Sequence, residues 1–197
     1  STMQAMVGMS NTNATANPPL TVSTTSMPYH CHLMQLAIAQ AHQSIPVDSA
    51  YCVGALVVSP QGNMATKNEA VAASILATGY SRELEGNTHA EECALMKMNK
   101  EGVATAGTDM YTTMEPCSKR LSGNAPCVQH IIAANIGRVF VGAREPDHFV
   151  ACQGVALLLE AGIEVYDVVY EGVREECLAP NQHIAKFNTG AQKGRAE

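Results

Sequence analysis

One stretch of the sequence organises the rest: Thr88-His89-Ala90-Glu91-Glu92-Cys93-Ala94-Leu95. Thr88 is a residue type that caps the N-termini of helices, and Glu91 falls in the first helical turn, where acidic side chains are favoured. Apolar residues follow at helical spacing: Ala90, Ala94, Leu95 and Met98. The stretch therefore predicts a helix that begins at His89 and carries an imidazole and a carboxylate two residues apart.

Upstream of this helix, the pattern changes from polar to apolar. Residues 1–27 are rich in Ser, Thr, Asn and Met and show no apolar periodicity, so we expect a flexible N-terminal tail. Leucines and alanines at helical spacing predict a helix near 29–44, which Pro46 ends. The apolar, β-branched run 52–58 predicts a buried strand, and it is followed by a turn and a second strand around 63–68.

Around and beyond the central helix, residues 77–88 contain two glycines and mixed charges and are expected to form a loop. Strands and helices then alternate. We expect strands at 109–114, 138–142 and 163–166, and helices at 126–135, 154–161 and 172–187. Short helix–strand units favour parallel strands. The sequence therefore predicts an α/β layer sandwich in one domain, residues 28–190.

Composition limits the classes of function. A chain of 197 residues with 46% hydrophobic residues can form one well-packed domain. A formal charge of −6 argues against a large nucleic-acid-binding surface, which needs a basic stripe. The sequence has no apolar signal region and no run of 18 apolar residues, and its seven cysteines are scattered. We expect a protein with reduced thiols and no membrane contact in the cytoplasm, with the nucleus as the alternative.

Two cysteines follow the central helix, each directly after a proline. Cys117 ends the run Met114-Glu115-Pro116-Cys117, and Cys127 ends the run Ala125-Pro126-Cys127. Thiolate and imidazole are the ligands that zinc prefers, and three protein ligands plus a water molecule are typical of a catalytic site. Both cysteines lie near expected helix starts, where backbone N–H groups favour the thiolate form. We therefore predict that His89, Cys117 and Cys127 bind Zn²⁺.

Glu91 has a different predicted role. It is too close in sequence to His89 to be a comfortable fourth ligand on one helix face. Zinc lowers the pKa of a bound water molecule to near neutrality, so the water becomes the nucleophile, and Glu91 can carry its proton to a leaving amine. His-x-Glu followed by Pro-Cys and a further Cys is the residue set of zinc deaminases. The alternative is a structural zinc site, which would need a fourth ligand such as Cys93 or His130.

The spacing of the two cysteines departs from the common Pro-Cys-x-x-Cys pattern, because nine residues separate Cys117 from Cys127. With His89-Ala90-Glu91 and residues 111–118 (YTTMEPCS), this pattern resembles the cytidine-deaminase-like superfamily. Within it, the chain is similar to the pyrimidine deaminases of riboflavin biosynthesis, whose zinc motif is stretched in the same way. The similarity covers roughly residues 30–185.

The fungal form of that enzyme is the most similar one, through residues 79–88 and 120–124. The resemblance implies a three-layer α/β/α sandwich with a central mixed sheet, one Zn²⁺ and a homodimer. It also implies a reaction: hydrolytic removal of the ring amino group from a 2,5-diamino-6-(ribitylamino)pyrimidinone 5'-phosphate. The partner would thus be a small phosphorylated pyrimidine.

The resemblance implies substrate contacts as well. In bacterial relatives, a lysine of the stretched cysteine loop and an Asp-Pro-Asn turn contact the substrate. Lys119 or Arg120 would stand in for that lysine, and Glu145 and Asp147 occupy the turn. The loop between the cysteines also offers Ser122 and Asn124 as hydrogen-bond donors for a phosphate or sugar chain.

Two bacterial contacts have no counterpart here, because Ala50-Tyr51-Cys52 and Ser81 stand in their places. Arg82 and Asn87 are candidate replacements. Alternatively, Arg82 pairs with Glu83 or Glu85 on a solvated loop.

Three other functions remain as alternatives. A cytidine or deoxycytidylate deaminase would have the short cysteine spacing. An RNA- or DNA-editing deaminase, for example one acting on tRNA, would need a basic strand-binding surface. A zinc-stabilised binding module without catalysis would have no use for Glu91 beside its metal.

Overall fold

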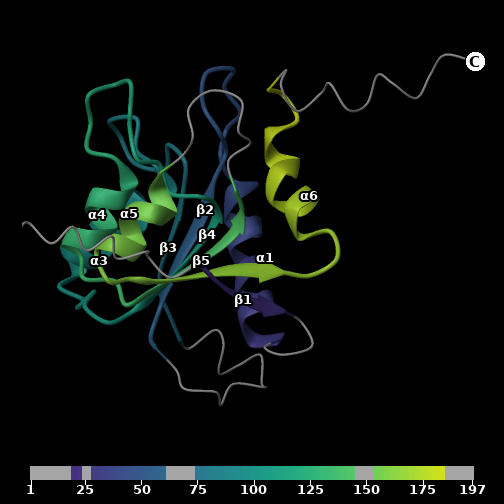
Figure 1. The fold of residues 1–197 in the computed structure, drawn as a ribbon. Coiled ribbons are helices and arrows are strands. Elements are labelled where there is room, and N and C mark those ends of the chain that lie inside the picture. Colours follow the sequence, from purple (N-terminus) through teal and green to yellow (C-terminus); the bar gives the residue numbers. More distant parts are fainter. Residues whose placement is uncertain (1–18, 24–27, 61–73, 145–152, 185–197) are drawn as a thin grey trace, which may run out of the picture.

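The computed structural model describes residues 19–23, 28–60, 74–144 and 153–184, which form an α/β fold around a six-stranded sheet (Figure 1). The strand order is β1-β6-β5-β4-β2-β3. The strands are β1 (Leu20–Ser23), β2 (Gly54–Val58), β3 (Ile75–Tyr80), β4 (Asp109–Met114), β5 (Arg138–Ala143) and β6 (Glu164–Val169).

The sheet is mixed, as expected. Strands β4, β5, β6 and β1 pair in parallel, whereas β2 runs antiparallel to both β3 and β4. The later strands are parallel because a helix connects each of them to the next, and such a crossover returns the chain in the same direction. The predicted parallel arrangement of the later strands is confirmed.

Helices cover both faces of the sheet (Figure 1). Helices α1 (Pro28–Ala41) and α6 (Val173–Leu178) pack on one face. Helices α3 (Ala90–Glu101), α4 (Cys127–Ala133) and α5 (Gly154–Glu160) pack on the other. Each face has its own apolar core, so the three-layer α/β/α sandwich is confirmed.

Strand β2 lies at the centre of this packing, and all five of its residues are buried. Successive side chains of a strand point to opposite faces. Leu56 and Val58 accordingly join the core under α1, and Val57 joins the core under α3. Burial on both faces explains why the sequence of β2 is continuously apolar rather than alternating.

The N-terminus of α3 sits directly against strand β3. A Cβ atom on Gly79 would lie 2.1 Å from the carbonyl oxygen of Ala90, closer than any side chain permits. Glycine is therefore required at this point of β3, and the close approach fixes where the helix begins. This contact positions the start of the helix, where His89 and Glu91 lie.

Four local expectations need correction. Residues 77–80 belong to β3 instead of a loop, because they pair with β2. Residues 20–23, within the expected tail, pair with β6 as an edge strand. Helix α6 ends at Leu178 and a 3-10 turn, Ala179–Asn181, follows, because the proline within that turn has no N–H to continue the helix. The cap of α3 is His89, not Thr88, whose hydroxyl donates to the carbonyl of Leu84 at 2.7 Å.

The remaining local expectations hold within a few residues at each end: the first helix, strands β2, β4, β5 and β6, and helices α3, α4 and α5. The expected strand around 63–68 lies outside the described residues, as do most residues of the expected tail. Within the described ranges, the helices are too short or too polar to cross a membrane.

Candidate active site

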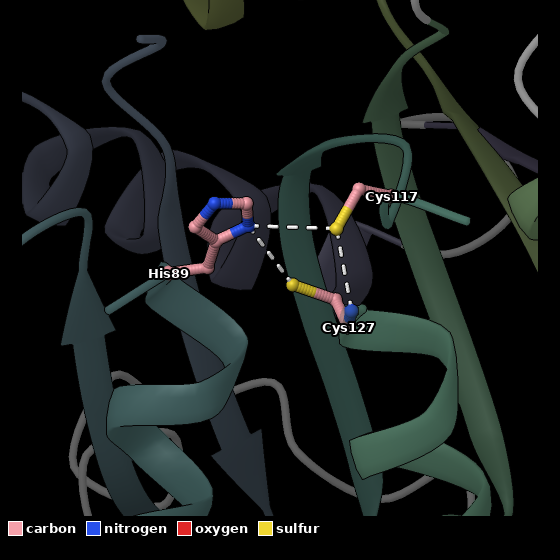
Figure 2. Close-up of side chains that lie close together, drawn as sticks. All are labelled: His89, Cys117 and Cys127. Atoms are coloured by element: carbon pink, nitrogen blue, oxygen red, sulfur yellow. Dashed lines mark hydrogen bonds between the residues drawn. The ribbon is translucent and has the colours of Figure 1, made fainter. Parts of the chain in front are cut away.

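Three side chains from separate elements meet at one end of the sheet (Figure 2). His89 is the N-cap of α3, Cys117 follows β4, and Cys127 is the first residue of α4. The Nδ1 atom of His89 lies 3.3 Å from Sγ of Cys127 and 3.5 Å from Sγ of Cys117. The three ligand atoms all lie within 4.8 Å of one another. The structure thus brings together the three predicted metal ligands.

The geometry and the donor set fit zinc. In a tetrahedral site with usual Zn–S and Zn–N lengths, a sulfur and a nitrogen ligand are about 3.6 Å apart. The observed separations of 3.3 and 3.5 Å are close to that value. Neither alternative fourth ligand belongs to the group: Cys93 Sγ donates to Thr88 Oγ1 at 3.0 Å, and His130 faces Glu92. Among the described residues, the site therefore has the three-ligand form of a catalytic metal centre.

The two thiols are chemically unequal. The backbone N–H of Cys127 donates to Sγ of Cys117 at 3.3 Å. Hydrogen bonds from Cys127 and His89 lower the pKa of the Cys117 thiol well below its usual value, although burial opposes them. The pKa of Cys127 is raised, first by its interaction with Cys117 and then by burial. The pair therefore readily holds one thiolate, which is the form that binds zinc.

Glu91 lies beside the three ligands, but it is not one of the group that could hold a metal. Its side chain is buried, and its Oε2 atom accepts a hydrogen bond of 3.3 Å from Sγ of Cys127. Burial, followed by the nearby charge of Cys117, raises the pKa of Glu91. For His89, burial lowers the pKa, but the hydrogen bond to Cys117 and the charge of Glu91 outweigh it and raise the pKa overall. The burial of Glu91 and its raised pKa match a carboxyl group that is placed for proton transfer.

A cavity of about 360 Å³ opens over these residues, which is within the range of small-molecule sites. Its lining includes the three ligands and Glu91. Its walls come from three segments: Ser49, Ala50, Tyr51 and Val53; Ser81, Arg82 and Asn87; and Met114, Glu115, Lys119, Arg120, Leu121 and Ser122. A ring of pyrimidine size could therefore reach the ligand cluster.

Comparison with known proteins agrees with this arrangement. The sequence model of the family described as cytidine and deoxycytidylate deaminase zinc-binding region matches residues 27–143, which include the whole cluster. The chain belongs to this deaminase family. Its zinc-binding region contributes the His-Cys-Cys site described above.

Relatives of the same family include enzymes of riboflavin biosynthesis. A diaminohydroxyphosphoribosylamino-pyrimidine deaminase of Schizosaccharomyces pombe is 41% identical over 170 residues, covering 84% of this chain and 38% of the relative. The riboflavin biosynthesis protein RibD of Chlamydia pneumoniae is 38% identical over 95 residues, covering 48% of this chain and 24% of that protein. The chain thus spans less than two fifths of these curated relatives.

Among solved structures, the Aspergillus oryzae Rib2 deaminase in complex with DARIPP superimposes with a TM-score of 0.61 and 31% identity. The superposition covers 79% of this chain and 100% of that structure. A diaminohydroxyphosphoribosylaminopyrimidine deaminase/reductase of Thermotoga maritima gives a TM-score of 0.64 with 29% identity, covering 82% of this chain and 42% of that one.

The candidate substrate-binding side chains differ in whether they already bond to other groups of the protein. Lys119 is exposed and Asn87 lies at the rim of the same cavity. Arg82 lines the cavity too, but its guanidinium donates to the carbonyls of Ile45 at 2.8 Å and Tyr51 at 3.1 Å. Its alternative partner Glu83 pairs with Lys97, at 2.7 Å.

Arg120 also lines the cavity and is bound to protein atoms. It pairs with Glu92 at 2.9 Å and donates to the carbonyls of Asn87 and Ala125. Glu145 and Asp147 lie outside the described residues, so their predicted roles stay predictions.

Sequence reasoning missed two residues at this site. Thr112 on β4 donates a hydrogen bond of 2.9 Å to Oε1 of Glu91. Glu92 accepts hydrogen bonds from the backbone of His89 and from Arg120. The available signals were a polar threonine in the middle of a predicted strand, and a glutamate at the third helical position, where it can complete a capping box.

Proposed function

We propose that this chain is a zinc-dependent hydrolase that removes the ring amino group of a 2,5-diamino-6-(ribitylamino)pyrimidinone 5'-phosphate in riboflavin biosynthesis. One observation carries the proposal: the His89–Cys117–Cys127 cluster opens into a cavity beside the buried carboxyl group of Glu91. The relatives named above support the substrate class, since two of them are pyrimidine deaminases by name and one was solved with DARIPP.

The chain's own residues provide the metal ligands and the group that transfers the proton. His89, Cys117 and Cys127 would hold Zn²⁺, which supplies an activated water molecule when it is bound. Glu91, with its raised pKa, takes a proton from the water and delivers it to the amino group that leaves. One water molecule is consumed, one molecule of ammonia is released, and the ring carbon exchanges its amino group for an oxygen. Burial of Glu91 keeps bulk water from competing for that proton.

Lys119 is the proposed contact for the phosphate group. It lies at the cavity wall, is exposed, and forms no ion pair among the described residues. Asn87 and Ser122 lie at the same rim and can hydrogen-bond the sugar chain. Arg82 can add positive charge, because its described hydrogen bonds go to uncharged groups. We also propose contacts from Glu145 and Asp147.

The cellular location, the oligomeric state, the domain bounds and the partner are also proposed. We propose a cytoplasmic homodimer whose deaminase domain spans residues 28–190 and whose partner is the phosphorylated pyrimidine rather than a nucleic acid. The formal charge of −6 supports the last point.

The test is ammonia release from purified, zinc-loaded protein. The ribitylamino and ribosylamino pyrimidine phosphates are compared with deoxycytidylate at equal concentration. We expect turnover of a diaminopyrimidinone phosphate and a preference for the ribityl form. Turnover of deoxycytidylate alone would establish the cytidine-type alternative, and zinc binding without turnover of any substrate would establish the binding-module alternative.

A further inference from the structure

One side chain of the loop between the two cysteines is almost fully buried. This Cys loop comprises residues 118–126, and its residues 121–125 are exposed. Leu121, at its tip, is fully exposed. The side chain of Arg120, by contrast, is only 3% exposed. The other described side-chain bonds from the loop to neighbouring segments are longer: Asn124 donates to the carbonyl of Gly86 at 3.5 Å, and the backbone N–H of Gln153 donates to Ser118 at 3.4 Å. Arg120 is therefore the strongest described anchor of the loop.

Arg120 connects the Cys loop to two other segments. Its Nη1 atom pairs with Oε2 of Glu92 at 2.9 Å and lies 3.3 Å from the carbonyl oxygen of Ala125, at the far end of the loop. Its Nη2 atom donates to the carbonyl of Asn87, in the segment before α3. A planar guanidinium can satisfy such diverging acceptors at once, which an ammonium group cannot do in the same geometry.

Glu92 links this ion pair to the metal ligands. The same Oε2 atom accepts a hydrogen bond of 3.1 Å from the backbone N–H of His89. Its Oε1 atom lies 3.7 Å from Nε2 of His130, one turn after Cys127 in helix α4. One carboxylate thus contacts the helix that carries His89, the helix that carries Cys127, and the loop between the two cysteines.

We propose that Glu92 and Arg120 are positioning residues that clamp the Cys loop to the start of α3. The clamp sets the distance between the metal ligands and the loop residues that contact substrate. This inference rests on the proposed function for its substrate. It assigns Arg120 an anchoring role, because its guanidinium already has three protein acceptors and its charge is balanced by Glu92. Of the two cations in the Cys loop, Lys119 is then the one left to meet the phosphate.

The test compares Glu92→Gln, Arg120→Gln and the double variant with wild type. Glutamine at position 92 can still accept from the backbone of His89, so Glu92→Gln removes the ion pair and keeps the cap. Each single variant should raise KM by about tenfold with kcat changed about twofold or less, because the loop is displaced while Glu91 stays in place. The double variant should have the same KM as the single variants, because each single substitution already removes the same ion pair. Lys97→Gln breaks a different ion pair of α3 and is the matched control.

Hydrogen exchange provides a readout that does not need turnover. In the free, zinc-loaded protein, amides of residues 118–125 should exchange about tenfold faster in both single variants, and those of β4 should not change. Arg120→Lys keeps the charge without the fork and should restore only part of the protection. It is also the substitute if Arg120→Gln does not fold.

Direct phosphate binding by Arg120 predicts a different pattern. Glu92→Gln would then leave KM and loop exchange unchanged or lower KM, while Arg120→Gln alone would raise KM; that pattern would overturn the clamp. Failure of the proposed function is separable from this outcome. If wild-type protein deaminates no pyrimidine, the function is wrong, while the exchange rates of the Cys loop still decide whether the clamp exists.

Discussion

The hydroxyl of Thr112 donates a hydrogen bond of 2.9 Å to Oε1 of Glu91, and both side chains are buried. Thr112 lies within β4, between strands β2 and β5, so pairing with a strand on each side fixes its position. The same hydroxyl also lies 2.9 Å from the carbonyl oxygen of Met114. Since a hydroxyl has one hydrogen, Thr112 donates either to the carboxylate of Glu91 or to that carbonyl. When it donates to Glu91, it holds the carboxylate in place.

Thr112→Val should therefore lower kcat and leave zinc content unchanged. Valine has nearly the same shape, but it leaves a buried carboxylate without one donor, and a hydrogen bond to a charged group contributes about 1.5–3 kcal/mol. This corresponds to a decrease in kcat of roughly ten- to a hundredfold, with little change in KM. Thr112→Ser keeps the hydroxyl and should recover most of the rate. Unchanged kcat in Thr112→Val would show that Glu91 is oriented by other groups.

Glu91→Gln should abolish deamination while the protein keeps its zinc. Glutamine preserves the size and the hydrogen bond from Thr112, but it cannot carry a proton between water and the leaving amine. General acid–base catalysis of this kind contributes about a hundred- to ten-thousandfold, so kcat should fall by at least the lower figure. Metal analysis by atomic absorption gives the second readout. Loss of zinc together with activity would mean that Glu91 belongs to the metal site itself.

The ligand cluster could be predicted from sequence because its signals are local. His89 and Glu91 share one helix start, and each cysteine directly follows a proline, after strand β4 for Cys117 and at the start of helix α4 for Cys127. Strand β4 was also predicted from the sequence, with the same bounds that the structure gives, Asp109–Met114. These predictions were possible because they depend on residue types at fixed spacing. They need no knowledge of which distant residues come into contact in the folded chain.

The features that sequence reasoning missed depend on distant partners. Strand β3 contains Gly79, which favours a loop when read alone and is required in the fold by the approach of Ala90. Arg120 and Glu92 are 28 residues apart in sequence, so their pairing needs the folded chain. The hydrogen bonds from the guanidinium of Arg82 go to carbonyls some 30 to 40 residues upstream, and no local pattern around Arg82 pointed to these partners.

Gly79→Ala should destabilise the protein and weaken its metal site together. The added Cβ would lie 2.1 Å from the carbonyl oxygen of Ala90 and 2.8 Å from the backbone nitrogen of Ala94, so helix α3 must move. Overpacking of this kind costs about 1–3 kcal/mol or more in the free energy of unfolding. Because His89 caps the displaced helix, zinc should also be lost at a lower chelator concentration.

Gly162→Ala is the matched control for this prediction. Gly162 has a φ of +82° and no atom within 4 Å of an added Cβ, so its substitution tests backbone strain without a clash. It should cost about 1 kcal/mol and leave chelator sensitivity as in wild type. Equal chelator sensitivity in the two variants would show that the contact between β3 and α3 does not position His89.

His30 should make the folded protein less stable in mild acid. Burial, followed by the charge of Arg138, lowers the pKa of His30 to about 4 from a usual value near 6.5. The ring stacks on Phe140 at a centroid distance of 4.4 Å and hydrogen-bonds the hydroxyl of Tyr111. Between these two pKa values the unfolded chain binds the proton and the folded chain does not. Stability from this group is therefore complete above pH 6.5 and is lost as the pH falls toward 4.

Urea unfolding at pH 7.5 and pH 5.0 measures this effect. His30 should account for a loss of about 1–2 kcal/mol in the free energy of unfolding between these conditions, and His30→Gln should remove that part of the loss. His42→Gln, at an exposed histidine just beyond the same helix, is the control for the substitution. Release of zinc in acid would affect wild type and both variants alike, so the difference between His30→Gln and wild type isolates the buried ring. Equal losses in these two proteins would mean that His30 takes up its proton in the folded state as readily as in the unfolded chain.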